Sequence, residues 1–405
     1  MAHETLTWLN ADFTERVLRF AELDSTINVI DIISKPATAI GDNYASDLVR
    51  VVAEFTRKEG KTKVKDKKSL LFKFEPIAEG PRKEMIMNIQ IFDAEIFMMT
   101  NTLRKMSKLL GSRLSAQAYY IKMERPLCLI LEDLAPLGFR MANRQLGLDM
   151  DHCKLAVQGL AKFHAASVAL CEKEPKQKEL YWRGMFHEAT TKDITQFFQI
   201  SCNSLANSME SWPQNGKRYA EKIKKFSDKI FERGMESMRR KDDEFNVINH
   251  GDAWTNNMMF RYDKNDKPID HIFVDFQVSV YTSPAIDLLY FLNTSVNEEI
   301  SNNGTDSLVE EYQRTLVATM KQIGCETQPP TLKEIKKQMS ERLVYGMISS
   351  MNTLPFALVD KRDAQSLDSL LEKMDNYQNP GYNNPLFQRI LLKRLEKFEA
   401  AGILD

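Results

Sequence analysis

Two short stretches decide the fold: Asn249 to Asn257, which reads NHGDAWTNN, and Val274 to Gln277, which reads VDFQ. Between them, Met258–Tyr262 is predicted to be a strand, 263–267 a polar turn and 269–275 the returning strand of a hairpin. The hairpin would bring Asn257 and Asp275 together at one end, with Asp252 on the loop just before it. In phosphoryl transfer from a nucleotide, one aspartate receives the proton of the attacking hydroxyl, while an asparagine and a second aspartate hold Mg²⁺.

The spacing of these residues is similar to that of the protein kinases. Asp252 precedes Asn257 by five positions, and Asp275 follows Asp252 by 23. His-Gly-Asp replaces the usual His-Arg-Asp, Gln277 stands where Asp-Phe-Gly has its glycine, and no Ala-Pro-Glu follows. These departures point away from protein substrates. The competing interpretation is a surface turn with solvated Asp and Asn side chains, which the combined pattern disfavours.

Upstream, Lys73 lies in the apolar run SLLFKFEP at 69–76, which predicts a buried strand closed by a proline. Its ammonium group would reach the nucleotide phosphates as a point charge. Glu95 begins a segment with apolar residues at 96, 99, 103, 106 and 110, which is one face of a helix. That helix can present Glu95 to Lys73. Glu84 and Asp93 are the alternative partners, and a solvated strand-edge position is the alternative for Lys73.

Two further segments are candidates for contact with the nucleotide. Gly41, Asn43 and Ser46 form a turn before a predicted strand at 47–55; glycine permits positive φ, and the two polar side chains offer donors to phosphate. An ordinary β-turn explains this segment about as well. The strand at 127–131 leads into Glu132, Asp133 and Leu134, whose backbone would bind adenine as a hinge between two lobes. The two acidic residues are otherwise the polar exit of a buried strand.

Composition restricts the class of protein. The chain has 405 residues, a length that suits two lobes around a cleft, and a formal net charge of −1, which gives no general attraction to nucleic acid or an anionic membrane. Its five cysteines have no CxxC spacing, which argues against a zinc site or a disulfide framework and for a reducing compartment. We expect no signal peptide and no membrane span. The six lysines of 58–68 are predicted to form a solvated hairpin tip.

The remainder is predicted to be largely helical, with Asp149 or Asp151 as the N-cap of a helix at 155–170. Later helices are expected at 192–211, 218–240, 307–323, 331–350 and 384–401. His164 is interpreted as a core histidine bonded to a backbone carbonyl, and Asp287 as a carboxylate that can also tie down the catalytic loop. The apolar cluster of residues 347, 351 and 354–356 either packs in the core, the favoured interpretation, or lines a substrate pocket.

The motifs together resemble the insect ecdysteroid kinase-like family, which is related to choline kinases and aminoglycoside phosphotransferases. The likeness covers roughly residues 39–292 and includes GDNYAS at 41–46, LEDL at 131–134, AKFHA at 161–165 and SPAIDL at 283–288, with the Trp254 of HGDAWTNN its most specific feature. The resemblance implies an α+β, bilobal protein-kinase-like fold. Residues 1–134 would form a small antiparallel-sheet lobe with one helix, and 135–405 a larger helical lobe. It also implies ATP, Mg²⁺ and phosphorylation of a small-molecule alcohol.

The leading hypothesis is therefore an ATP-dependent kinase for hydroxyl groups of steroid-like or xenobiotic compounds, acting in hormone metabolism or detoxification. Asp252 would be the base, Asn257 and Asp275 the Mg²⁺ ligands, and Lys73 the phosphate clamp, tethered by Glu95. We expect a cytoplasmic enzyme. The alternatives are a non-catalytic protein of kinase fold that binds small molecules or nucleotides, a kinase for a choline-like small polar alcohol, and a metal-dependent hydrolase. The sequence leaves the acceptor hydroxyl and the oligomeric state open.

Overall fold

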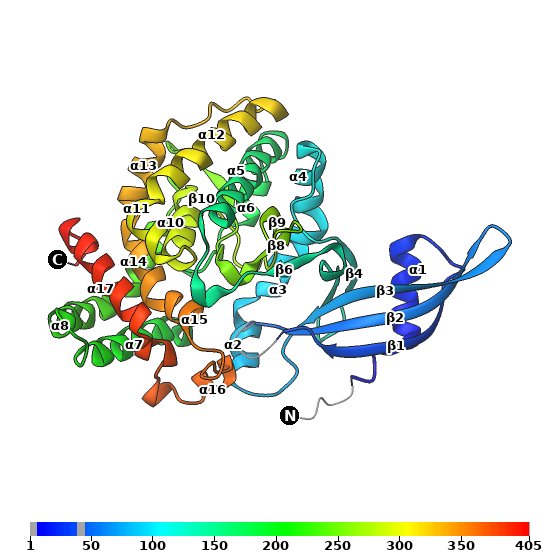
Figure 1. Cartoon of the computed structure of the whole chain (residues 1–405), viewed down its shortest axis with the longest axis horizontal. Coiled ribbons are helices and arrows are strands. Elements are labelled where there is room, and N and C mark those ends of the chain that lie inside the picture. The colour runs from blue at the N-terminus through cyan, green and yellow to red at the C-terminus, as the bar shows by residue number, and fades with distance from the viewer. Residues whose placement is uncertain (1–5, 39–44, 405) are drawn as a thin grey trace.

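The computed structural model describes residues 6–38 and 45–404. A small part built on an antiparallel sheet lies beside a larger, mostly helical part (Figure 1). This arrangement confirms the predicted α+β, bilobal kinase-like fold class. None of the helices in the described ranges is both long enough and apolar enough to cross a membrane.

Five antiparallel strands in the order β1-β2-β3-β5-β4 make the sheet. Side chains alternate between its two faces. Val51 and Phe72, on one face, are buried against helix α1 (Ala11–Glu22), which packs with Val17 and Leu18. Lys73 points from the other face, which looks toward the helical part. The strands are β1 (Asn28–Pro36), β2 (Asp47–Glu59), β3 (Thr62–Phe74), β4 (Ala118–Lys122) and β5 (Cys128–Glu132).

The prediction of a lysine-rich hairpin tip at 58–68 was wrong in extent. β2 continues to Glu59 and β3 begins at Thr62, so only two residues form the tip and most of the lysines lie on strands. Lysines at alternate positions of a long two-stranded ribbon stay solvated, so the sequence has the polarity of a loop although the backbone is paired.

Glu95 lies on α3 (Ile91–Phe97), which continues through a π-helical stretch Met98–Thr102 into α4 (Leu103–Leu110). Gln90, in the left-handed conformation, separates α3 from the preceding α2 (Pro81–Ile89), and together these segments form a helical stack. The predicted apolar face is confirmed at Met99, Leu103, Met106 and Leu110, all of which are buried. They pack against the long helix α5 (Met150–Lys173). The N-cap of α5 is Asp149, which was one of the two predicted candidates.

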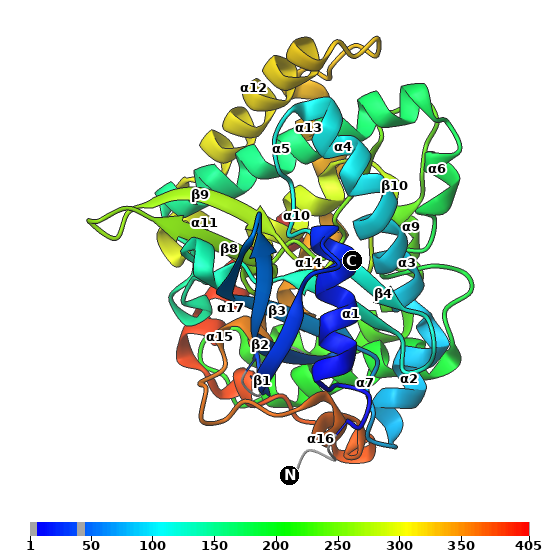
Figure 2. The ribbon, with the colours of Figure 1, turned by 90° about the vertical axis from the view of Figure 1, so that its right-hand side faces the viewer.

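Helices α6 to α17 make most of the larger part (Figure 2). Two of the helices predicted as single are broken. The 218–240 segment forms two helices joined by a 3₁₀ turn, and the 331–350 segment divides at Arg342. The helices are α6 (Gln177–Leu180), α7 (Lys192–Met209), α8 (Gly216–Phe226), α9 (Ile230–Met238), α10 (Ala285–Thr294), α11 (Glu298–Asn303), α12 (Thr305–Ile323), α13 (Leu332–Glu341), α14 (Leu343–Asn352), α15 (Leu354–Leu358), α16 (Leu367–Leu371) and α17 (Pro385–Ala400).

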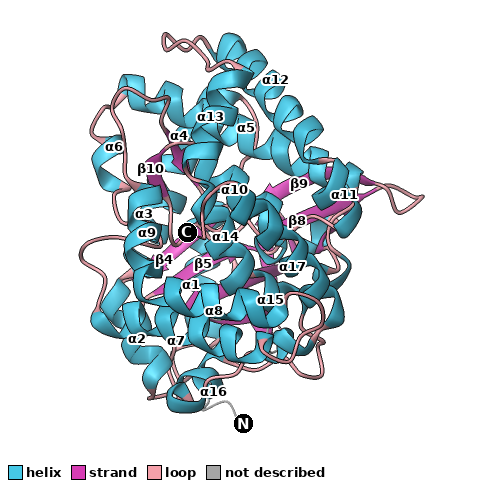
Figure 3. Ribbon diagram, turned by 90° about the vertical axis from the view of Figure 1, so that its left-hand side faces the viewer, coloured by secondary structure: helices cyan, strands magenta, loops and turns pink. Residues whose placement is uncertain are grey.

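Short strands flank the two stretches at 249–257 and 274–277. Figure 3 shows β8, β9 and β10 as magenta arrows among the cyan helices. The predicted hairpin is confirmed, with its turn at 263–267. β8 and β9 form a three-stranded sheet with β6, while β7 and β10 pair with each other. The strands are β6 (Phe139–Met141), β7 (Val247–Asn249), β8 (Met258–Tyr262), β9 (Pro268–Phe273) and β10 (Val280–Thr282).

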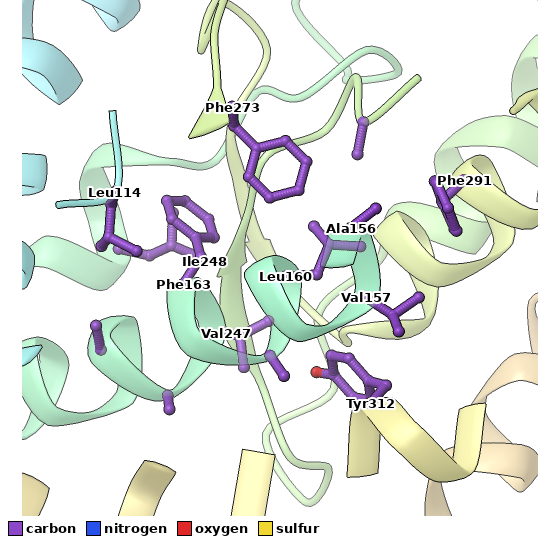
Figure 4. Packing of buried hydrophobic residues seen from close by; sticks show 14 of the residues in the cluster. Leu114, Ala156, Val157, Leu160, Phe163, Val247, Ile248, Phe273, Phe291 and Tyr312 are labelled. Atoms are coloured by element: carbon purple, nitrogen blue, oxygen red, sulfur yellow. The ribbon is translucent and has the colours of Figure 1, made fainter. Parts of the chain in front are cut away.

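The largest core surrounds α5, which packs with α10, α12 and the short strands (Figure 4). Phe163, Phe291 and Tyr312 are fully buried there. A second core joins α7, α10, α14 and α17. Met347, Met351 and Leu354 belong to this second core, so the favoured interpretation of the methionine cluster as core packing is confirmed.

Candidate active site

Lys73 on β3 joins residues from two distant parts of the chain. Its Nζ atom donates hydrogen bonds to Glu95 Oε1 at 2.8 Å and to Asp275 Oδ1 at 2.9 Å. Lys73 and Glu95 are both buried, and Asp275 is partly exposed. The predicted partner of Lys73 is therefore correct, and the ammonium group lies between a carboxylate of the smaller part and a carboxylate of the larger part.

Asp252 and Asn257 form the second half of the site. Asn257 Nδ2 donates to the Asp252 carboxylate at 2.8 Å and to the Asp252 carbonyl oxygen at 2.9 Å. Because a carbonyl oxygen only accepts hydrogen bonds, these contacts fix the orientation of the Asn257 amide. The backbone amide of Val274 donates to Asn257 O at 3.0 Å, which ties the end of β9 to the loop. Lys73, Asp252, Asn257 and Asp275 thus converge as predicted.

The backbone of Asp275 is in the left-handed region, with φ of 69°. Aspartate tolerates this conformation better than most residues, yet it is uncommon outside glycine and is concentrated at functional sites. The turn directs the Asp275 carboxylate out of the β9 line toward Lys73.

Buried Asp287 on α10 holds the loop before Asp252. The two Asp287 oxygens accept hydrogen bonds from the backbone amides of His250 at 2.7 Å and Gly251 at 2.8 Å. His250 Nε2 donates to the Val274 carbonyl oxygen at 3.1 Å, so Nδ1 accepts from the Asp252 amide at 3.3 Å. Burial lowers the pKa of His250. Both side chains therefore brace the loop, as the sequence indicated.

His164 was predicted to bond a backbone carbonyl, and this was wrong. Its ring bonds the Tyr312 hydroxyl at 2.7 Å and Asp287 at 3.0 Å. The histidine therefore supports the Asp287 carboxylate that holds the loop before Asp252. His164 on α5 and Asp287 on α10 are far apart in the sequence. His164 remains a fully buried residue.

Burial and neighbouring charge set the protonation of the site. Burial raises the pKa of Asp252 to about 7, and the negative charge of Asp275 adds to this, while hydrogen bonds from Tyr290 and Asn257 act in the opposite direction. Burial alone would lower the pKa of Lys73, but Asp275 and Glu95 raise it, so the amine stays charged. Burial also raises the pKa of Glu95, against the influence of Lys73. A carboxyl with a pKa near neutrality is suited to exchanging a proton with a hydroxyl.

The predicted nucleotide contacts are placed only in part. Gly41 and Asn43 lie outside the described residues, and Ser46 is buried directly before β2. At the predicted hinge, the Glu132 amide donates to Gln117 O at 2.8 Å, and the Leu134 carbonyl accepts from Leu137 and Phe139.

The side chains at the predicted hinge make ion pairs, which agrees with the interpretation of a polar exit from the strand. Asp133 binds Arg50 and Ser69, and Glu132 pairs with Arg113. Because Arg50 lies opposite Leu71 in the β2–β3 register, and Leu48 opposite Lys73, the Arg50–Asp133 pair is on the same face of the sheet as Lys73.

The residues present fit a magnesium ion that is shared with phosphates. Both Asn257 Nδ2 hydrogen bonds go to Asp252, which leaves its carboxamide oxygen as a ligand atom, and Asp275 supplies carboxylate oxygen. In the described part of the chain, no group of three or more His, Cys, Asp or Glu side chains could hold a metal by itself. A site with one carboxylate and one amide agrees with the preference of Mg²⁺ for few protein ligands completed by phosphate and water.

Sequence reasoning missed two contacts of the site. The Tyr290 hydroxyl on α10 donates to Asp252 Oδ1 at 2.5 Å, and Gln277 Nε2 donates to Glu95 Oε2 at 3.3 Å. Nothing in the apolar sequence of α10 marks Tyr290 as part of the site. Gln277 was recognised only as a departure from the glycine of protein kinases, and its side chain proves to link the segment after Asp275 to α3.

The model of the ecdysteroid kinase-like family matches residues 40–325, well over half of the chain and the whole span of the site. The chain belongs to the ecdysteroid kinase-like family. Membership places it among kinase-like phosphotransferases, the class predicted from its motifs. A search of curated proteins found no match to the sequence.

Among the solved structures that are similar to this chain are two small-molecule kinases. One is an ethanolamine kinase of Plasmodium vivax, with 13% identity, a TM-score of 0.42, and coverage of 91% of this chain and 84% of that one. The other is a spectinomycin phosphotransferase in complex with ADP and spectinomycin, with 10% identity, a TM-score of 0.37, and coverage of 98% of each chain. The family assignment depends on the family model.

Proposed function

We propose that this protein transfers the γ-phosphoryl group of ATP to a hydroxyl group of a steroid-like or xenobiotic small molecule. The observation that carries the proposal is the convergence of Lys73, Glu95 and Asp275 with Asp252 and Asn257. A binding protein would have no need of a carboxyl with a pKa near 7 and a buried, charged lysine that both interact with Asp275.

Asp252 would orient the acceptor hydroxyl and receive its proton. As the acceptor oxygen forms its bond to the γ-phosphorus, the bond from that phosphorus to the bridging oxygen of ADP breaks, and ADP leaves with the electron pair. Tyr290 and Asn257 would hold the Asp252 carboxylate in a fixed position during this step.

The remaining residues would bind the nucleotide. Lys73, held by Glu95, would bind phosphate oxygens, and the backbone at Glu132, Asp133 and Leu134 would contact adenine, with Gly41, Asn43 and Ser46 near the phosphates. Asn257 and Asp275 would hold Mg²⁺, which when bound neutralises charge on the phosphates. We propose the cytoplasm as the location, because all five cysteines are free thiols and four of them are buried. Both a hormonal and a detoxifying role fit this chemistry.

The test is Mg²⁺-dependent ATP consumption with a panel of hydrophobic alcohols, followed by mass spectrometry for the addition of one phosphate to the alcohol. Asp252→Asn should reduce turnover by at least a hundredfold, because the proton acceptor is lost, while the affinity for ATP changes less than threefold. ATP binding without phosphorylation of any alcohol in a broad panel would instead favour the non-catalytic alternative. Turnover by Asp252→Asn within a few-fold of the unchanged protein would refute the assignment of the base.

A further inference from the structure

A largely apolar pocket of about 450 Å³ lies between α3, the segment 180–198 and the segment that follows Asp275. We name it the α3 pocket. Its volume is within the range of small-molecule sites. Apolar side chains make most of the wall; they include Ile89, Phe97, Trp182, Met185, Phe197 and Val278.

Two large apolar side chains of the α3 pocket are unusually exposed. Leu180 is 49% exposed and Trp182 is 52% exposed, although most large apolar residues of the described chain are buried. Both lie at the same pocket instead of being scattered over the surface. Exposed apolar surface gathered at a concave site is typical of ligand binding, since an occupant removes that surface from water.

The α3 pocket also contains two buried polar atoms without a hydrogen-bond partner in the described structure: His187 Nδ1 and Thr190 Oγ1. Buried polar atoms are nearly always paired, so an unpaired couple in an otherwise apolar wall requires an explanation. The His187 ring packs edge-on against Trp182, with 5.5 Å between centroids, which fixes its position. Burial lowers the pKa of His187, so the ring is neutral at pH 7 and can exchange a hydrogen bond with a hydroxyl or carbonyl group.

The floor of the α3 pocket is the segment 277–279, which also contacts the catalytic machinery. Gln277 bonds Glu95, the partner of Lys73. The Ser279 hydroxyl donates to the His250 carbonyl oxygen at 3.4 Å. A Cβ atom added to Gly251, the neighbour of Asp252, would lie 2.1 Å from the Val278 carbonyl oxygen. Hence the 277–279 segment contacts both the α3 pocket and the loop that carries Asp252.

We propose that the α3 pocket binds the apolar body of the acceptor alcohol, with His187 and Thr190 hydrogen-bonded to a polar group on that body. This inference rests on the proposed kinase function. The pocket selects a bulky, mainly apolar molecule that carries an oxygen function besides the hydroxyl that is phosphorylated. Gln277 and Val278 line the pocket, and Val278 lies against Gly251, the neighbour of Asp252, so the reactive hydroxyl would lie at the end of the pocket formed by the 277–279 segment, toward Asp252.

The first variant fills the α3 pocket. Ala94→Leu adds an apolar side chain from α3 into the lining, and leucine preserves helix propensity. The matched control is Ala189→Leu, which adds the same bulk at an exposed neighbour of Thr190 outside the lining. With an alcohol that the unchanged enzyme phosphorylates, Ala94→Leu should raise KM for the alcohol at least tenfold and leave KM for ATP within twofold. Ala189→Leu should leave both constants unchanged.

The second variant removes the hydrogen-bonding group without changing shape. Thr190→Val should raise KM for an alcohol that carries a second oxygen function three- to tenfold, and should have no effect on an analogue that lacks it. An unaltered KM for the alcohol in both Ala94→Leu and Thr190→Val would overturn the inference while the kinase function stands. Absence of turnover with every alcohol in the unchanged enzyme would instead refute the proposed function, and this inference with it.

The fluorescent probe 1-anilinonaphthalene-8-sulfonate provides a readout that does not depend on turnover. Ala94→Leu should weaken its binding at least tenfold relative to Ala189→Leu, and a phosphorylatable alcohol should displace it. Probe binding that Ala94→Leu leaves unchanged, or that the alcohol does not displace, would also overturn the inference.

Discussion

At the scale of single residues, Asp252 has the environment that a base requires. Its raised pKa has two physical causes, burial and the nearby Asp275, and Tyr290 partly offsets them through a hydrogen bond to the charged form. The same tyrosine fixes the position of one carboxylate oxygen, while Asn257 fixes the other. The Asp252 carboxyl is therefore held in a fixed position, and its pKa stays near 7.

The pH dependence of kcat/KM tests this account. A base must be deprotonated, so activity should fall as the pH decreases through about 7, the pKa of Asp252. Tyr290→Phe removes a hydrogen bond that lowers this pKa, so the acidic limb of the profile should move to higher pH by about half a unit or more. Tyr345→Phe is the control, since that buried tyrosine lies beside Tyr290 and its hydroxyl has no hydrogen-bond partner among the described residues. A lower kcat with an unmoved limb would mean that Tyr290 has only a structural role.

At the scale of elements, the sequence predicted the helices and strands that local patterns determine. It did not predict the boundaries that depend on contacts with distant residues. The β8–β9 hairpin was placed within about two residues, because alternating apolar residues and a polar turn are read within a dozen positions. Helix α13 ends at Glu341, and its C-cap Arg342 is buried and bonds Glu244 and the Ser237 carbonyl, about 100 positions away. No pattern in the neighbouring sequence predicts this contact.

The candidate site divides in the same way. Asp252, Asn257 and Asp275 were predicted from their spacing, because a metal and a triphosphate require fixed residue types at fixed positions. Lys73 was predicted from an apolar strand and Glu95 from the apolar face of a helix. The supporting contacts of Tyr290, Tyr312 and Gln277 escaped prediction, since each is a common residue type whose role appears only when its partner from a distant element is in contact. The α3 pocket was missed for the same reason: its wall comes from three segments far apart in the chain.

The contact of the catalytic loop with the 277–279 segment can be tested at Gly251. Its φ of +85° makes a side chain unfavourable, and the 2.1 Å approach of a Cβ to the Val278 carbonyl oxygen leaves no room for one. Gly324→Ala is the matched control, with φ of +73° and open space around the added methyl group. It should lose only about 1 kcal/mol of unfolding free energy, the conformational cost of a positive φ. Gly251→Ala should lose at least 2 kcal/mol more in chemical denaturation, because backbone must also move. Equal losses would show that the loop and this segment are not in close contact.

At the scale of the whole molecule, the division of the chain at residue 134 remains a prediction. The sheet has its own core with α1, which includes Cys128, whereas Cys153 and Cys171 lie in the core around α5, and Cys202 in the core of α7 and α14. Yet Met99, Leu103 and Met106, on the helical stack of the sheet part, pack in the α5 core. The stack therefore joins the two parts, as do Ala118 and Leu129 of the sheet, and only the face of the sheet toward α1 has a core of its own.

The rate at which each cysteine is alkylated, measured by mass spectrometry, should show whether these cores open independently. Burial raises the pKa of all five thiols, to about 12 for Cys171 and about 11 for Cys325, so each reacts slowly until its surroundings open. Cys325, which is only half-buried, should react first in the native protein. Cys128 should follow, because a smaller core opens at a lower free energy than a larger one. Cys153, Cys171 and Cys202 should react last and at similar rates, and all five should react at once in guanidinium chloride. A single shared rate for Cys128 and these three would mean that the sheet and the helical part unfold as one cooperative unit, which contradicts a boundary at residue 134.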